Sequence, residues 1–480
     1  MDLRDIYWGD ESAENDANLL KYFIDPQKIE RMVKQSKSII VGRKGAGKSA
    51  IRKYLSDYMK QRGDKQIVVE AKPNYSFVST TKRDDEIILK NEIFYQNLWC
   101  QYLFKLAVLE VGDLCKDKKV SASEEYARTL AKQYDMTNLD FIESLVSALK
   151  SIKMQAGESG EFGLDIENQI KKQLDIDTLA YHIKKLTRMG YRFTFIIDDL
   201  DLGWDNSDIA NNLLLGLFSS INYMKSLVDN NINIFLCVRN DMYDILMSYT
   251  THSDKYRNCE YINWDNGSLI DLLTERLKFN YIENNLQVPE DIWSDVFPDK
   301  LGRNNVKKWM LDRTLQRPRE LLQLARRYTE STAVVDSEKL KSAEEIYSKW
   351  KLDDLCTEHK FSYPGLWDIF DFWRKEFYRS KYHLTKEEYE PIIKRIFEKV
   401  NLHEKWYTDL VNAGDIEGFM KILYNIGFVG DFIRGGQGGN KAIYAYQEEG
   451  NAPRLREVQI HPCFRKTLGV VERIRKKKEI

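Results

Sequence analysis

The sequence has no long apolar run and few cysteines, and each lack excludes a class of protein. No stretch of its 480 residues approaches the roughly 18 to 20 apolar residues that a membrane-spanning helix needs, so we expect no membrane span. The acidic N-terminus has no apolar segment of the kind that signal peptides carry. Six scattered cysteines without a C-x-x-C pair indicate neither a zinc site nor a disulfide framework. Reduced thiols in a cytoplasmic protein are the simplest expectation.

Net charge is lacking as well. The 73 basic and 74 acidic side chains nearly cancel, so no overall field draws the protein to nucleic acid or anionic lipid. Any such partner must therefore be met by a local patch. With 43% hydrophobic and 31% charged residues the chain is expected to fold as a soluble protein, and its length suggests two to four domains.

What the sequence does contain is a phosphate-binding loop. The stretch IIVGRKGAGKSA (residues 39–50) fits the pattern G-x-x-x-x-G-K-S/T. Its glycines let backbone N–H groups turn inward on a β-phosphate, Lys48 can reach the β- and γ-phosphate oxygens, and Ser49 can ligate Mg²⁺. We therefore expect a nucleotide site made of nine residues: Gly42, Arg43, Lys44, Gly45, Ala46, Gly47, Lys48, Ser49 and Ala50.

A second acidic motif follows the apolar strand expected at residues 192–198. Asp198 would hold Mg²⁺ together with Ser49, and Asp199 could orient or deprotonate an attacking water. Small-molecule kinases need a substrate hydroxyl at that place, so the paired acids favour hydrolysis. The N-K-x-D motif of GTPases is not found where it is expected, which favours ATP. The alternative is that Asp199 and Asp201 only cap the next helix.

Further polar residues follow the next strands. Arg239 and Asn240 come after the strand expected at residues 232–238, where a parallel sheet delivers side chains to its ligand crevice, so either could contact the γ-phosphate or the attacking water. One of them could instead be a helix cap. Lys255 and Arg257 lie where an oligomeric ATPase would project a cation, an arginine finger, into the active site of its neighbour. A solvated basic turn is the alternative.

A pair of arginines flanks a proline at the start of a later amphipathic helix. Arg317 and Arg319 enclose Pro318, which is tolerated in a first helical turn. One of these arginines could reach the γ-phosphate and couple it to the position of its helix. Both could instead be exposed.

The order of elements predicts an α/β fold with a P-loop core, a helical lid and a C-terminal winged-helix-like domain. Further strands are expected at residues 66–71 and 259–264. A glycine-rich turn (435–439) between strand-like segments suggests the wing, and the basic tail (473–478) could add phosphate contacts. The expected divisions are an N-terminal segment (1–36), the core (37–265) with a helical insertion at about 84–190, the lid (266–352) and the C-terminal domain (353–480).

Taken together, these motifs resemble the AAA+ superfamily. More narrowly, GDESAEND (residues 9–16), IIVGRKGAGKSA, IIDDLD and RPRELLQLA resemble a family of bacterial P-loop ATPases of defence islands, akin to the STAND and KAP NTPases, over about residues 7–330. The resemblance implies an ATP-driven switch that works in antiviral defence beside an effector protein, as a homo- or hetero-oligomer. It also places Tyr7 and Trp8 near the adenine, with a hydrophobic anchor on the core as the alternative.

The chain departs from this family in two places. Its insertion is longer than a plain AAA+ core needs, and residues 202–204 (LGW) stand where KAP proteins tend to have an arginine, which leaves the finger assignment open. The sequence thus predicts an ATP-hydrolysing molecular switch that uses Mg²⁺. One alternative is an initiator or loader that binds DNA through its C-terminal domain. The other is a regulatory module that binds ATP without hydrolysing it.

Overall fold

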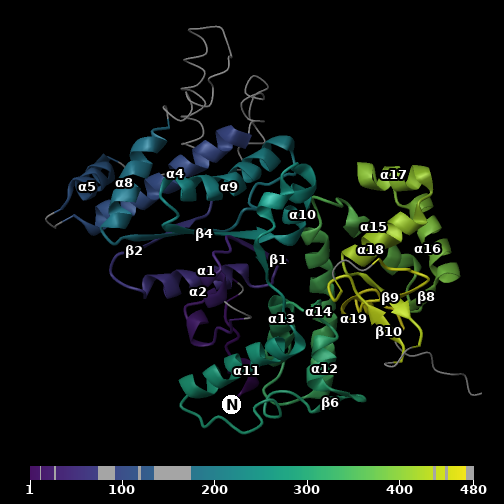
Figure 1. Ribbon diagram of the computed structural model, residues 1–480. Coiled ribbons are helices and arrows are strands. Elements are labelled where there is room, and N and C mark those ends of the chain that lie inside the picture. The colour runs from purple at the N-terminus through teal and green to yellow at the C-terminus, as the bar shows by residue number, and fades with distance from the viewer. Residues whose placement is uncertain are drawn as a thin grey trace, which may run out of the picture. The chain divides into compact units, whose positions relative to one another are not determined.

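The computed structural model describes residues 1–10, 12–25, 29–73, 92–116, 120–133, 174–435, 439–448 and 452–471 (Figure 1). It divides into two compact units. One is Asp10–Asn263, here called the sheet unit, and the other combines Met1–Gly9 with Trp264–Ile480, here called the C-terminal unit. The chain therefore passes from one unit to the other twice, after Gly9 and after Asn263.

The sheet unit is built on a five-stranded parallel sheet of order β2-β3-β4-β1-β5. Its strands are β1 (Ile39–Gly42), β2 (Gln66–Ala71), β3 (Arg192–Ile197), β4 (Ile232–Arg239) and β5 (Cys259–Tyr261). Because all five run the same way, their carboxyl ends meet at one edge of the sheet. The residues that follow β1, β3 and β4 are thereby brought to the same edge.

Both faces of this sheet are buried, as the strand sequences require. Successive side chains of β1 point to opposite faces, so Ile40 packs in one core cluster while Ile39 and Val41 pack in another. The first cluster lies under α1 (Ile29–Lys34) and α2 (Lys48–Lys60). The second lies under α4 (Glu92–Leu114), α8 (Ile176–Arg188), α9 (Asp208–Leu227) and α10 (Asn240–Tyr249), and Figure 1 shows α4, α8 and α9 on the side of the sheet opposite to α1 and α2.

The predicted insertion is helical wherever the structure describes it. Besides α4 and α8 it contains α5 (Ala122–Gln133), which packs on α4. α4 is buried along most of its length because α9 packs on it closely at Gly216, where an added Cβ would lie 2.3 Å from the Tyr95 side chain. The glycine-rich loop at residues 157–163 lies outside the described residues.

The C-terminal unit begins with helices. They are α11 (Asn266–Glu283), α12 (Val306–Leu311), α13 (Pro318–Thr329) and α14 (Ser337–Glu358), with the short strands β6 (Lys300–Leu301) and β7 (Asn304–Asn305) between α11 and α12. Residues 1–9, which include η1 (Leu3–Asp5), pack on this helical part. Trp8 is 2% exposed, and its indole Nε1 donates to Thr329 Oγ1 at 2.8 Å.

The remainder of the C-terminal unit contains a four-stranded antiparallel sheet of order β10-β9-β11-β8. Its strands are β8 (His383–Thr385), β9 (Val429–Ile433), β10 (Lys441–Ile443) and β11 (Glu457–Ile460), and its helices are α15 (Leu366–Glu376), α16 (Lys386–Lys399), α17 (Lys405–Ala413), α18 (Ile416–Asn425) and α19 (Pro462–Arg465). Helix α18 leads into the β9–β10 hairpin, which is the winged-helix-like arrangement. The predicted fold class is confirmed: a parallel α/β core with a helical insertion, a helical part and a winged-helix-like part.

Two predictions at this end are only partly covered. Of the glycine-rich turn, Gly435 and Gly439 are described, both with positive φ (81° and 75°), while residues 436–438 and the tail at 473–478 lie outside the described residues.

Within the described residues, no helix combines the length and the apolar character that crossing a membrane requires. All six cysteines are free thiols, and five of them are buried.

Candidate functional site

The phosphate-binding loop connects β1 to α2 as the sequence predicts. β1 ends at Gly42 and α2 begins at Lys48, so the loop opens directly onto a helix N-terminus. Gly45 and Gly47 have φ values of 76° and 94°, in the left-handed region that favours glycine. The loop and the first turn of α2 hold all nine predicted residues: Gly42, Arg43, Lys44, Gly45, Ala46, Gly47, Lys48, Ser49 and Ala50.

The Lys48 ammonium lies over this loop. Its Nζ donates to the carbonyl oxygens of Gly42 at 2.9 Å and Arg43 at 3.2 Å. Burial lowers the pKa of Lys48, and the nearby negative charge of Asp198 opposes that shift. A cation hydrogen-bonded to carbonyl oxygens in this way can be drawn to a phosphate that carries full negative charges.

Asp198 follows β3 and lies beside Ser49. Its side chain is nearly inaccessible to water, with the residue 2% exposed. Burial raises the pKa of Asp198, the charge of Asp199 adds to that rise, and a hydrogen bond from Ser49 opposes it. Among the described residues, Asp198 Oδ2 accepts no hydrogen bond, although Arg52 Nε lies 3.4 Å from it. A buried carboxylate next to a hydroxyl is the oxygen donor set that Mg²⁺ prefers, so the residues fit the predicted cation.

Asp199 differs from its neighbour in being accessible. Its side chain is 40% exposed, and its Oδ2 lies 3.1 Å from Lys72 Nζ. Its φ of 58° turns the backbone sharply directly after the strand. The two adjacent acids therefore face different surroundings, one buried beside Ser49 and one open to water.

Arg239 and Asn240 both lie at the end of β4, but their side chains point to different partners. Arg239 is paired in register with Gly42 across the sheet, and its guanidinium contacts Asp201 at 3.0 Å and Asp241 at 2.6 Å. Burial disfavours its charge, yet these two acids outweigh burial and raise the pKa of Arg239. Asn240 is the first residue of α10 and donates to Asp244, one turn along its own helix, at 3.0 Å. The γ-phosphate sensor role stays a prediction for both.

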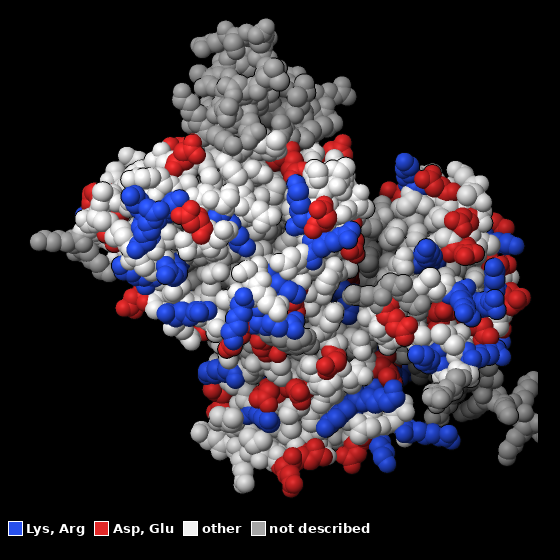
Figure 2. Space-filling model, in the orientation of Figure 1, with Lys and Arg blue, Asp and Glu red and all other residues white. Residues whose placement is uncertain are grey.

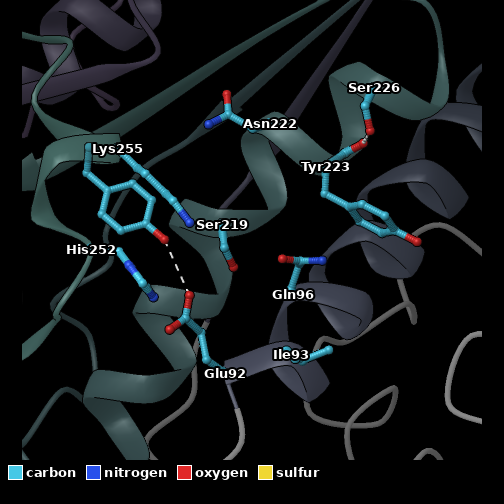
Figure 3. Close-up of a pocket in the computed structure, with 10 residues that line it drawn as sticks. Glu92, Ile93, Gln96, Ser219, Asn222, Tyr223, Ser226, His252 and Lys255 are labelled. Atoms are coloured by element: carbon cyan, nitrogen blue, oxygen red, sulfur yellow. Dashed lines mark hydrogen bonds between the residues drawn. The ribbon is translucent and has the colours of Figure 1, made fainter. Parts of the chain in front are cut away.

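Lys255 and Arg257 lie before β5, whereas Asp198 lies after β3, so the sheet places them at its opposite edge. Both are exposed, around the short helix η6 (Ser253–Tyr256). Figure 3 shows Lys255 at a pocket of about 1000 Å³ that is also lined by Glu92, Ile93, Gln96, Ser219, Asn222, Tyr223, Ser226, His252 and Tyr256. The predicted finger could therefore act only on another subunit, and the finger role stays a prediction.

Arg317 and Arg319 are both engaged inside the C-terminal unit. Arg317 is 4% exposed and donates to Glu358 at 2.6 Å, with Glu320 3.6 Å away. Burial disfavours its charge, but Glu358 and Glu320 outweigh it and raise the pKa of Arg317. The Arg319 guanidinium lies over the Trp350 ring, 5.8 Å from its centroid. Their predicted contact with a γ-phosphate also stays a prediction.

Tyr7 and Trp8 are placed differently from each other. Trp8 is buried, and its backbone carbonyl accepts from Arg276 Nε at 3.1 Å. Tyr7 is 38% exposed, while its backbone N–H and C=O both bond the Asn280 side chain. All these partners belong to the C-terminal unit, so within that unit Trp8 is a hydrophobic anchor.

The sequence did not predict the charged side chains that surround Asp198 and Asp199. Arg52 is 7% exposed and contacts Glu14, Glu70 and Asp198, while Lys72 contacts both Glu14 and Asp199. Arg52 lies one helical turn after Lys48, a spacing that could have indicated it. The GDESAEND motif contains Glu14, but the motif itself does not indicate that this side chain lies near Asp198 and Asp199.

Comparison with known proteins finds partial matches. Residues 267–356 match the family model described as the FunZ-associated C-terminal helical domain. The chain is 25% identical over 491 aligned positions to the "Putative transposon gamma-delta 80.3 kDa protein" of Escherichia coli (strain K12), covering 95% of this chain and 66% of that protein. It therefore spans slightly less than two thirds of the length of that relative.

Two solved structures are similar over most of the chain at low scores. One is the Aeropyrum pernix ORC1 protein in complex with DNA, with 11% identity, 96% of each chain covered and a TM-score of 0.39. The other is the Aeropyrum pernix ORC2 protein in ADPNP-ADP complexes, with 11% identity, 95% of this chain and 92% of that chain covered, and a TM-score of 0.29.

Proposed function

We propose that this protein binds and hydrolyses ATP and uses the nucleotide state as a molecular switch. One observation carries the proposal: the parallel sheet brings Lys48 and Ser49, which follow β1, to the same edge as Asp198 and Asp199, which follow β3, and Ser49 is close enough to Asp198 to affect its pKa. A phosphate loop alone would fit many enzymes. The loop together with a buried acid and an exposed acid fits attack by water on a bound triphosphate.

The role of each residue follows from its surroundings. Backbone N–H groups of the loop and the Lys48 ammonium would bind the β- and γ-phosphates. Ser49 and Asp198 would hold Mg²⁺, which neutralises charge on the phosphates when it is bound. Asp199, which water reaches, would orient the attacking water and accept its proton. Arg239, held between Asp201 and Asp241, would fix the neighbouring end of β4.

The exposure of Asp199 favours hydrolysis over mere binding of ATP. A module that only binds ATP needs the loop and the cation ligands but has no need of a second acid that water can approach. Two substitutions distinguish ATP hydrolysis from ATP binding alone. Lys48→Ala should abolish ATP binding, measured by calorimetry, whereas Asp199→Asn should keep ATP affinity within about twofold and lower phosphate release by roughly 10²-fold or more.

The control for this experiment is Asp205→Asn. Asp205 is an exposed acid six residues further along the same loop, and its carboxylate accepts from Ser207 N–H at 3.0 Å. This variant should match the wild type in both measurements. Equal phosphate release from the wild type and Asp199→Asn would refute the mechanism, and a wild type that binds ATP without releasing phosphate would favour the regulatory module.

The switch would act on other proteins, a part of the proposal that the motif resemblance alone supports. We propose an oligomer in which Arg257 or Lys255 completes the site of a neighbour, and an effector protein as partner in antiviral defence in the cytoplasm. Light scattering should show an ATP-dependent increase in mass that Arg257→Ala reduces. An unchanged monomer would contradict the finger role, and co-purification from the native host would identify or exclude an effector.

DNA binding by the winged-helix-like part is a second candidate. One observation favours it: the β9–β10 hairpin carries Arg434 and Lys441, whose side chains are 66% and 61% exposed. On the face shown in Figure 2, basic side chains are interspersed with acidic ones, so such a contact would be local. Duplex binding should weaken with salt, and Arg434→Ala with Lys441→Ala should reduce the salt slope by about two.

The control for the hairpin variant removes the same charge elsewhere. Lys278→Ala with Lys341→Ala deletes two lysines whose side chains are 44% and 48% exposed on α11 and α14. If both double variants lose affinity equally, the contact is not on the hairpin. If the wild type shows no salt-dependent binding to duplex DNA, this candidate is refuted.

A further inference from the structure

The N-terminal residues 12–16 are fixed against the helix that follows the phosphate loop. Lys53 Nζ, on α2, donates to the backbone carbonyls of Ala13 at 3.3 Å, Glu14 at 3.3 Å and Asp16 at 2.6 Å. Asp16 is 1% exposed, and its carboxylate accepts from the Tyr22 hydroxyl. This segment therefore has a defined place in the sheet unit, although Lys48 lies 32 positions after Asp16 in the sequence.

The fixed segment directs the Glu14 side chain toward the catalytic acids. Glu14 Oε1 accepts from Arg52 Nη2 at 3.1 Å and also from Lys72 Nζ. Carboxylate oxygens of Glu14, Asp198 and Asp199 all lie within 4.8 Å of one another. Three negative charges at this spacing repel one another, and the positive charges of Arg52 and Lys72 reduce that repulsion.

Lys72 is the cation that links Glu14 to the exposed acid. It follows β2 directly after Ala71, and its ammonium contacts Glu14 Oε1 as well as Asp199 Oδ2, the latter at 3.1 Å. An ammonium is a compact charge with three donors, so two carboxylates can share it, and each weakens its pairing with the other. The strength of the Lys72–Asp199 pair therefore depends on Glu14.

We propose that Glu14 is a positioning residue for ATP hydrolysis, which acts on Asp199 by competing for Lys72. This inference rests on the proposed ATPase function. With Glu14 ionised, Lys72 is shared, and lone pairs of Asp199 stay available to water. Without that charge, the ammonium belongs to Asp199 alone, which leaves the carboxylate fewer positions from which to accept a hydrogen bond from the attacking water.

The alternative is that Glu14 only anchors the N-terminal segment. The two ideas differ in how the effect of Glu14 depends on Lys72. An anchor would matter equally whether or not Lys72 is present, whereas a competitor for Lys72 has nothing to act on once the ammonium is gone. A double-mutant cycle measures this dependence directly.

The experiment compares the wild type, Glu14→Gln, Lys72→Met and the double variant by ATP affinity, kcat and KM. Glu14→Gln should lower kcat about fivefold, the size expected for one partly exposed ion pair, with ATP affinity unchanged. Lys72→Met should have a kcat at or above that of the wild type. The double variant should match Lys72→Met, and Glu14→Asp should recover part of the loss because it restores the charge.

Glu30→Gln is the matched control. Glu30 lies on α1 of the same unit, its side chain is 67% exposed, and its ion pair with Lys34 at 3.7 Å is local. This variant should leave kcat unchanged. If Lys72→Met does not fold, as judged by thermal unfolding, Lys72→Gln replaces it in the cycle because it also removes the charge from a side chain of similar length.

Three outcomes would overturn the inference. An unchanged kcat in Glu14→Gln, with an active wild type, refutes it and leaves the ATPase function standing. An equal loss of kcat from Glu14→Gln with and without Lys72 shows a structural anchor instead. A wild type that binds ATP without turnover refutes the proposed function, and this inference falls with it.

Discussion

The carboxylate of Asp198 is almost inaccessible to water. The residue is 2% exposed, and both burial and the charge of Asp199 raise its pKa. The folded protein therefore binds the Asp198 proton more tightly than the unfolded chain does. As pH rises from the ordinary value near 3.8 through the raised value, this group lowers the stability of the folded state, and above both values the full cost remains.

This reasoning predicts that Asp198→Asn stabilises the protein while impairing its chemistry. At pH 7 the amide removes a buried charge at nearly the same volume, so unfolding of the sheet unit should occur about 2–4 °C higher, which corresponds to roughly 1 kcal/mol in a unit of this size. The gain should shrink as pH falls toward 4. Thermal unfolding at both pH values checks it, together with Mg²⁺-dependent phosphate release, which should be lost.

Asp205→Asn is again the comparison, because that acid is exposed and should shift the unfolding temperature little. An Asp198→Asn variant less stable than the wild type at pH 7 would mean that Arg52 and Ser49 stabilise the ionised carboxylate by more than burial costs it.

At the scale of elements, the strands were predictable and their neighbours in space were only partly so. β2 matches the expected residues 66–71, and β3 and β4 each end within one residue of the expected end, because short apolar runs bounded by polar residues are typical of buried strands. The carboxyl ends of parallel strands meet by geometry, so the pairing of the phosphate loop with Asp198 followed from the sequence. β5 is shorter than expected, covering Cys259–Tyr261 of the run at 259–264.

The contacts of Glu14 and Lys72 could not be predicted. These residues lie 58 positions apart, and each stands in a polar segment that reads like a solvated surface. Ion pairs follow neither a sequence period nor a residue propensity, so the local sequence does not indicate which charged side chains pair in the folded protein. The engagement of Arg317 was hidden for the same reason, since its partner Glu358 is 41 positions away.

Helices α13 and α14 are joined by charges that water does not reach. Lys351 is fully buried and contacts Glu320 at 2.9 Å, and Arg317 contacts Glu358 at 2.6 Å. Burial alone would raise the pKa of Glu358, but Arg317 outweighs it and holds that pKa well below the usual range. The stability that Glu358 contributes is thus present above the ordinary carboxyl range and is lost only in strong acid.

These contacts predict different results for the two candidate sensor arginines. Arg317→Met leaves Glu358 buried without its cation and should destabilise the C-terminal unit by about 3 kcal/mol or more. Arg319→Met loses only a partly exposed contact with Trp350, about 0.5–1 kcal/mol. Denaturant unfolding measures both, and phosphate release at 25 °C separates stability from chemistry.

The hypothesis that one of these arginines senses the γ-phosphate predicts a different result for the same variants. An arginine that reaches the γ-phosphate should, when replaced, lower turnover at unchanged stability. A stable, slow Arg319→Met would support Arg319 in that role. An Arg317→Met variant with wild-type stability would contradict the importance of the buried ion pairs.

At the scale of the whole molecule, the N-terminal residues belong to both units. Residues 1–9 group with the C-terminal unit, whereas Glu14 lies in the sheet unit, only five positions after Gly9. The backbone carbonyl of Gly9 accepts from Arg326 on α13. The chain thus runs from Gly9, which is hydrogen-bonded to α13 in the C-terminal unit, to Glu14, whose carboxylate contacts Arg52 and Lys72 in the sheet unit.

This division predicts that ATP and Trp8 act on different parts of the protein. Under the proposed function ATP would bind the folded sheet unit, so at a concentration 100 times its Kd it should stabilise that unit by about 2.7 kcal/mol. Trp8→Ala removes a buried indole and its hydrogen bond to Thr329, and should destabilise the C-terminal unit by about 3–5 kcal/mol.

Hydrogen exchange followed by mass spectrometry separates the effect of ATP from the effect of Trp8→Ala, because peptides of β1, β3 and β4 report on the sheet unit and peptides of α11 and α13 on the C-terminal unit. Protection by ATP confined to the first set, with loss in Trp8→Ala confined to the second, is the expected pattern. If Trp8→Ala also removed the protection that ATP gives to β1 and β3, the indole would contribute to the nucleotide site, as the resemblance to the defence ATPases implies.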